Sequence, residues 1–206
     1  MSMIQTRIYL ASQSPRRREL LKQIGVNFEM LLLRADVARG LDVDETPLVN
    51  EGAENYVRRI CSEKASKGYS MLRYRSLPVA PVLAADTAVI LDGKILGKPE
   101  NPAHAAEMLR ALSGREHQVL TGVAVAMGEH VEMAMSASTV RFVELDDERI
   151  RRYLMTSEGK DKAGGYAIQG LGGAFVANLS GSYSGVVGLP LCETVMLLKK
   201  FDIPTP

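Results

Sequence analysis

Apolar and polar residues recur along the chain with two different periods, and this pattern predicts an α/β protein. Apolar runs of four to eight residues indicate buried strands, whereas apolar residues three to four positions apart indicate helices. We expect strands that end at Leu10 or Ala11 and that cover 26–33, 81–85 with its continuation 88–91, 118–127, 133–143 and 175–179. We expect helices from about Ser14 to Gly25 and over 54–67, 102–112, 146–155 and 191–200.

The connections between these elements favour a mixed sheet over a strictly parallel one. Asp92-Gly93 is a strong signal for a two-residue hairpin, and such tight turns join antiparallel strands. We expect 36–55 to form an exposed loop and Gly68 to end a helix before a polar connection over 69–78. The glycine-rich segment 161–173 predicts close approach of backbones, not a packed element, and 181–185 is expected to be a turn.

A predicted anion site lies where the first strand meets the first helix. Ser14 is suited to cap the helix, Pro15 to occupy its first position, and the arginines 16–18 to follow in its first turn. Free backbone N–H groups and guanidinium groups at a helix N-terminus form a natural phosphate site. Arginines there oppose the helix dipole, so the turn is mildly unfavourable without an anion. A basic turn that is simply solvated is the alternative.

Four polar residues elsewhere are candidates for chemistry, and three of them have a structural alternative. Asp86 interrupts a buried apolar strand, where it either caps a turn or faces a ligand crevice. Lys64 lies on or beside the apolar stripe of its helix, so it either extends to solvent or faces a cleft. Gln169 could present its amide to a nucleobase or brace its own loop, and Lys98 carries little information alone.

Composition limits the classes of partner. The 206 residues carry a formal net charge of +1, which provides no global attraction for nucleic acid or anionic lipid. Tryptophan is absent and aromatic residues make up 5%, so few platforms exist for stacking single-stranded nucleic acid. The chain has no signal pattern and no apolar run of membrane-spanning length, and its cysteines, Cys61 and Cys192, lack metal-like spacing. We therefore expect a cytoplasmic protein that binds neither nucleic acid nor membranes.

Taken in order, several motifs resemble those of one family. The stretch Ser12-Gln13-Ser14-Pro15-Arg16-Arg17 resembles the Ser-x-Ser-Pro-Arg-Arg signature of the Maf family of nucleoside triphosphate pyrophosphatases. Ala85-Asp86-Thr87 and Gly97-Lys98-Pro99 are similar to the central elements of that family. The segment from Asp161 to Gly170 and Val186-Val187-Gly188-Leu189-Pro190 resemble its glycine-rich and closing motifs. The match spans about residues 8–200.

The resemblance implies a fold and a reaction. The fold would be the α/β Maf/ITPase-like architecture, a single domain over 1–206 with two lobes around a long mixed sheet and a central substrate cleft. The reaction would be hydrolysis of a nucleoside triphosphate to the monophosphate and pyrophosphate, with a role in nucleotide-pool sanitation. A divalent cation, Mg²⁺ or Mn²⁺, would assist, since both suit carboxylate and phosphate oxygens. A homodimer is typical of the family.

The resemblance also implies roles for individual residues. Asp86 matches the proton acceptor of the family and is our candidate metal ligand. Arg16, Thr87 and Gln169 match positions linked to substrate choice, while Lys64 and Lys98 match lysines of the cleft. With Ser12 and Arg17, these cations would neutralise the triphosphate.

The sequence leaves two points open. The loop after the second strand is longer than in many relatives, so the additional acid of the family is expected at Asp44 or Glu45 in preference to Asp36. The motif Ile168-Gln169-Gly170 resembles that of the dTTP/UTP branch of the family. A pyrophosphatase acting on 7-methyl-GTP and a non-catalytic regulator of septum formation and cell division are the alternatives.

Overall fold

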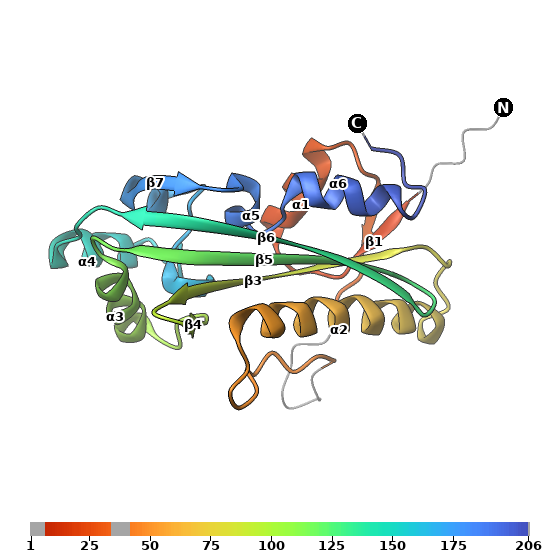
Figure 1. The fold of residues 1–206 in the computed structure, drawn as a ribbon, viewed down its shortest axis with the longest axis horizontal. Helices are drawn as coiled ribbons and strands as arrows, with labels where there is room; N and C mark the ends of the chain where they lie inside the picture. Colours follow the sequence, from red (N-terminus) through yellow and green to blue (C-terminus); the bar gives the residue numbers. More distant parts are fainter. Residues whose placement is uncertain (1–6, 34–41, 206) are drawn as a thin grey trace.

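A long mixed sheet of seven strands runs through the molecule (Figure 1). The computed structural model describes residues 7–33 and 42–205. The strands are β1 (Ile8–Leu10), β2 (Phe28–Met30), β3 (Val82–Leu91), β4 (Lys94–Leu96), β5 (Glu116–Met127), β6 (His130–Phe142) and β7 (Val176–Ser180). They follow the order β2-β1-β3-β5-β6-β7, and β4 pairs with β3. Among the strands of these described residues, only the β1–β2 and β1–β3 pairings are parallel, so the predicted mixed sheet is confirmed.

Helices cover both faces of this sheet. They are α1 (Pro15–Gln23), α2 (Ala53–Tyr74), α3 (Pro102–Leu112), α4 (Asp147–Met155), α5 (Tyr183–Val187) and α6 (Leu191–Lys199). Helix α2 lies along one face, whereas α1 and α6 cover the opposite face (Figure 1). A third apolar cluster joins α3 and α4 to the far ends of β3, β5 and β6.

The first helix begins as the sequence predicts. The Ser14 hydroxyl accepts a hydrogen bond from the Arg17 N–H at 3.4 Å, and Pro15 occupies the first helical position. Leu20 and Leu21 are buried against the sheet, so the apolar stripe is also confirmed. The first turn contains no acidic residue. Its N-terminal N–H groups therefore have no local carboxylate partner.

Helix α2 is longer than the sequence predicts. It continues to Tyr74, so the helix end at Gly68 and the polar connection over 69–78 were wrong. Gly68 lies inside the helix, where a Cβ atom would be 2.8 Å from Val82 Cγ1 on β3. The glycine thus allows the helix to approach the sheet closely, and this packing outweighs its low helix propensity. In sequence, a glycine that ends a helix looks the same as a glycine at which a helix packs closely on a sheet.

Three further boundaries differ from the predictions. Strand β2 covers only Phe28–Met30 instead of 26–33, and β6 begins at His130 instead of 133. The predicted turn over 181–185 is instead the start of α5, whose cap Ser182 accepts the Gly185 N–H at 3.0 Å. In the part of the chain that is described, no helix is both long and apolar enough to cross a membrane.

His117 on β5 should make the stability of the fold depend on pH. Its side chain is 2% exposed, and Nε2 lies 2.8 Å from the Tyr166 hydroxyl. Burial lowers the pKa of His117 to about 4. The unfolded chain binds this proton at a pKa of about 6.5, so stability is complete above that pH and falls as the pH drops towards 4. We expect the free energy of unfolding to be about 2 kcal/mol lower at pH 5 than at pH 7.5 from this group alone.

Urea unfolding at both pH values measures this loss. His117→Phe keeps an aromatic ring against Phe142, which packs edge-on to the histidine at 5.0 Å between ring centroids. The variant should lose about 2 kcal/mol of the pH dependence, whatever its stability at pH 7.5. An unchanged pH dependence in the variant would show that His117 does not carry it.

Candidate active site

A cleft of about 1100 Å³ opens beside β3 and the start of α1. It is lined by side chains from the turn 11–17, from Glu45 and Lys64, from 86–89 on β3, from 95–100 and from the glycine-rich segment 161–170. The sequence motifs that lie far apart in the chain therefore meet in one place. A cleft of this size accommodates a nucleotide-sized ligand.

Asp86, Lys64 and Glu45 form a line of alternating charge in the cleft. The Lys64 ammonium lies 2.8 Å from Asp86 Oδ1 and 2.7 Å from Glu45 Oε1. Burial opposes the charge on Lys64, but the two carboxylates outweigh it and raise its pKa above the ordinary value. Burial likewise opposes ionisation of Glu45, and Lys64 outweighs it, so the pKa of Glu45 is lowered. Lys64 and Glu45 are therefore both charged at neutral pH.

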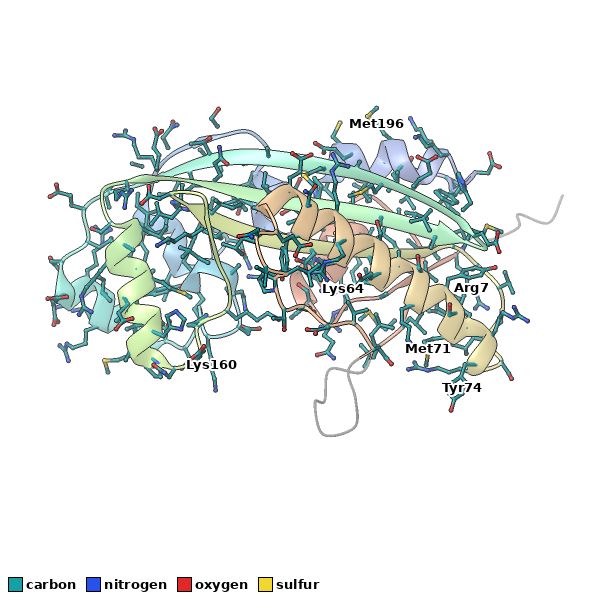
Figure 2. The ribbon with its side chains drawn as sticks, turned by 60° about the horizontal axis from the view of Figure 1, so that its bottom comes forward. Arg7, Lys64, Met71, Tyr74, Lys160 and Met196 are labelled. Carbon is teal, nitrogen blue, oxygen red and sulfur yellow. The ribbon has the colours of Figure 1, made fainter. Side chains whose placement is uncertain are left out.

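The packing of α2 explains why Lys64 reaches Asp86. The labelled Lys64 in Figure 2 lies on α2 near the middle of the molecule, while Tyr74 marks the far end of that helix. Gly122 on β5 pairs with Asp86, and a Cβ atom on it would be 2.8 Å from Cys61 Sγ. This close crossing places Lys64, one turn after Cys61, beside the carboxylate. Of the two alternatives for Lys64, the structure therefore shows the one that faces the cleft.

Arg17 is held by the protein itself. Its Nε donates to the Gly188 carbonyl at 2.7 Å, and its two terminal nitrogens donate to Ser12 Oγ at 3.3 Å and Thr87 Oγ1 at 3.2 Å. Thr87 Oγ1 also lies 3.0 Å from Thr121 Oγ1, its partner across the β3–β5 pair. Arg17 thus links the α1 turn to β3 and to the closing motif. Its guanidinium group is oriented before any ligand arrives.

Arg16, in contrast, is half-buried in the cleft without such partners. Within residues 7–33 and 42–205 its Nε is buried and has no hydrogen bond. Burial and the neighbouring charge of Arg17 lower the pKa of Arg16, and Asp161 only partly opposes them. A buried cation with unused donors is costly unless an anion binds it. Among the described residues Arg18 Nε is likewise buried without a partner, but Arg18 does not line the cleft, so Arg16 is the arginine there with hydrogen bonds to offer a ligand.

The structure distributes the remaining candidates unevenly. Lys98 Nζ lies 3.8 Å from Glu45 Oε2 and is largely exposed, and Gln169 is exposed on the cleft lining. Asp44 is exposed, and its carboxylate accepts the Thr46 N–H at 2.9 Å, away from the cleft lining. Of the two preferred acids, only Glu45 therefore reaches the cleft. Asp36 lies outside the described residues.

The donor set tests whether a divalent cation would fit. Glu45 and Asp86 present two carboxylates to one point, now contacted by the Lys64 ammonium. No group of three or more His, Cys, Asp or Glu side chains suited to a metal occurs among the described residues. Mg²⁺ is commonly bound by one or two carboxylates together with substrate phosphates, and Mn²⁺ takes similar oxygen ligands. Glu45 and Asp86 fit that pattern.

Two residues that support the cleft were not identified from the sequence. Glu158 accepts hydrogen bonds from backbone N–H groups of the glycine-rich segment, and Thr121 stands behind Thr87. Glu158 lies in an exposed-looking polar stretch after α4, and Thr121 lies in an apolar strand. For Thr121, the signal that could have found it is the pairing of β3 with β5, which places it opposite Thr87.

Comparisons with known proteins agree with these motifs. The family model described as "Maf-like protein" matches residues 7–201. The chain is 55% identical over 203 residues to a protein of Nitrosospira multiformis, covering 98% of each chain. It is 53% identical over 196 residues to one of Nitrosomonas europaea, covering 95% of each. Both relatives are named "dTTP/UTP pyrophosphatase". The Staphylococcus aureus Ham1 structure aligns at 15% identity with a TM-score of 0.45, over 66% of this chain and 72% of that one.

Proposed function

This chain belongs to the Maf-like protein family, and we propose that it hydrolyses dTTP and UTP to the nucleoside monophosphate and pyrophosphate. The observation that carries the proposal is the meeting of two halves in one cleft. One half is the charged line of Asp86, Lys64 and Glu45, and the other is the basic turn of Arg16 and Arg17. Relatives above 50% identity over nearly the whole chain, all named for this activity, support the substrate class.

The basic turn would bind the triphosphate. Arg16 offers unused donors, and the N-terminus of α1 adds backbone N–H groups and a favourable dipole. Arg17 is already oriented by Ser12, Thr87 and the Gly188 carbonyl, so it can stabilise charge without reorganising. Lys98 lies near Glu45 Oε2, whereas Lys64 contacts Glu45 Oε1. Lys98 would neutralise the departing pyrophosphate.

Asp86 would act as the general base. It takes the proton of the water that attacks the α-phosphorus, the bond from that phosphorus to the bridging oxygen breaks, and pyrophosphate leaves. Lys64, 2.8 Å from Asp86 Oδ1, would hold that carboxylate in place. A divalent cation, Mg²⁺ or Mn²⁺, held by Asp86 and Glu45 with phosphate oxygens, would polarise the phosphoryl group. We assign the additional acid to Glu45 because Asp44 points elsewhere.

A panel of nucleoside triphosphates tests the substrate class. With Mg²⁺ or Mn²⁺ present, pyrophosphate release should be fastest for dTTP and UTP. Fastest release from 7-methyl-GTP would instead support the purine branch. No release from any nucleotide would support a non-catalytic role in septum formation and cell division. We also propose a cytoplasmic location and a homodimer; gel filtration with light scattering tests the latter.

Gln169 would read the edge of the pyrimidine base. Its amide can pair with both the carbonyl and the N–H of uracil or thymine, and the 5-methyl group lies away from that edge. We expect Gln169→Ala to reduce the preference for UTP over CTP by about tenfold, since one lost pair of hydrogen bonds is worth about 1–2 kcal/mol. The dependence of the rate on metal concentration should stay the same. Unchanged selectivity among dTTP, UTP and CTP would contradict this role.

A further inference from the structure

The segment that carries Gln169 is tied at one end to α4 and at the other to the turn that follows α4. The Ala167 N–H donates to the Tyr153 hydroxyl at 3.1 Å. On the other side of Gln169, the Leu171 N–H donates to Glu158 Oε2 at 2.9 Å. The Gly172 N–H donates to Glu158 Oε1 at 3.0 Å. Between these ties the Gly170 N–H donates to the Ala167 carbonyl at 3.2 Å, which places Gln169 in a tight turn.

The two anchoring side chains also contact each other. The Tyr153 hydroxyl donates to Glu158 Oε1 at 3.0 Å, so one hydroxyl serves both ends of the segment. Tyr153 is buried and packs edge-on against Phe175, with 4.9 Å between ring centroids. Tyr153 therefore stands on α4, which is packed into the third apolar cluster, so the position of its hydroxyl is set by packing.

The glycines of the segment fit this arrangement. A Cβ atom on Gly170 would be 2.2 Å from Glu158 Oε2, and one on Gly172 would be 3.1 Å from the Tyr153 hydroxyl. Any larger residue at 170 would displace the carboxylate. Gly170 is thus required so that the backbone can approach Glu158, and Gly172 so that it can approach Ala167 and Tyr153. This gives a specific reason for a motif that the sequence marks only as glycine-rich.

We propose that Glu158 and Tyr153 are positioning residues that fix the turn over 167–172 and so aim Gln169 at the base of the substrate. This inference rests on the proposed function, in which Gln169 reads the pyrimidine edge. The backbone N–H groups keep Glu158 ionised: burial opposes its charge, but the donors from Gly172 and Leu171 outweigh burial and lower its pKa. Neither residue needs to touch the nucleotide, because each acts through the backbone on either side of Gln169.

A double-mutant cycle tests the link to Gln169. In Glu158→Gln one acceptor oxygen becomes an amide NH₂ that faces a backbone donor, so the tie is broken with little change in volume. We expect the preference for UTP over CTP in kcat/KM to fall about tenfold in Glu158→Gln and several-fold in Tyr153→Phe. Adding Glu158→Gln to Gln169→Ala should change the preference less than twofold, because both act through one contact.

Glu148→Gln serves as the matched control. This carboxylate lies on α4 itself, is exposed, and pairs with Arg151 and Arg152 outside the cleft. Its substitution should leave the UTP preference unchanged. Independent, multiplying losses in the double variant, or an unchanged preference in Glu158→Gln, would overturn the positioning role.

Hydrogen exchange separates this inference from the proposed function. Without nucleotide, the amide hydrogens of Leu171 and Gly172 should exchange at least tenfold faster in Glu158→Gln than in the wild-type chain, since their acceptor is lost. Equal exchange rates would overturn the inference even for an active enzyme. If the wild-type chain hydrolysed neither dTTP nor UTP, the proposed function would fail, and the exchange rates would still decide whether Glu158 fixes the turn.

Discussion

Asp86→Asn is expected to lower kcat by about 1000-fold while leaving a folded protein, because removing a general base typically costs 100- to 10,000-fold. Asparagine has the shape of aspartate and can still accept a hydrogen bond from Lys64. Breaking a buried ion pair is normally destabilising because one charge is left alone. Here Lys64 retains Glu45 at 2.7 Å, so we expect a fall in melting temperature of only a few degrees.

Pyrophosphate release at saturating UTP, together with thermal unfolding, measures both effects. Asp92→Asn is a suitable control, because Asp92 is exposed at the β3–β4 hairpin and pairs with Arg115. That variant should keep the wild-type kcat. Turnover within tenfold of wild type in Asp86→Asn would remove Asp86 from the role of base, and a large loss of melting temperature would make its contribution structural.

The elements at the start of the cleft could be predicted because their signals are local. A serine cap, a proline at the first helical position and an apolar stripe are all contained in one short stretch, and they define α1 correctly. The apolar run of β3 likewise predicted a buried strand. Asp86 within it was recognisable as a candidate site residue, since a charge in a buried strand is unfavourable without a partner. Local chemistry sufficed for these elements.

Other features depend on contacts across the fold. Gly68 has the sequence signal of a helix end, but its crossing over Val82 keeps it helical. The charge on Lys64 finds its partners on β3 and in the preceding loop, at distances in sequence that no periodicity reveals. Glu158 acts through backbone N–H groups 13 and 14 positions away. The sequence pattern marked Lys64 as unusual and did not mark Glu158. The partners of both residues are set by tertiary packing.

The unequal surroundings of Arg16 and Arg17 imply a cost in stability that serves binding. Arg17 has three protein acceptors, whereas Arg16 is half-buried, lies beside another cation, and has an Nε without a partner among the described residues. Both burial and Arg17 lower the pKa of Arg16, which means that its charge destabilises the free protein. Such local conflict is typical of functional sites, where binding of the ligand supplies the missing partner.

Arg16→Gln should therefore separate binding from stability. We expect kcat/KM for UTP to fall about 100-fold, because hydrogen bonds to charged groups are worth about 1.5–3 kcal/mol each and Arg16 can make more than one. The melting temperature of the free protein should stay equal or rise, since the desolvated charge and its repulsion with Arg17 are removed. Arg18→Gln, one position outside the cleft lining, should change kcat/KM less than threefold. A clear fall in melting temperature with unchanged kcat/KM would show instead that Arg16 supports the fold and leaves the triphosphate to Arg17.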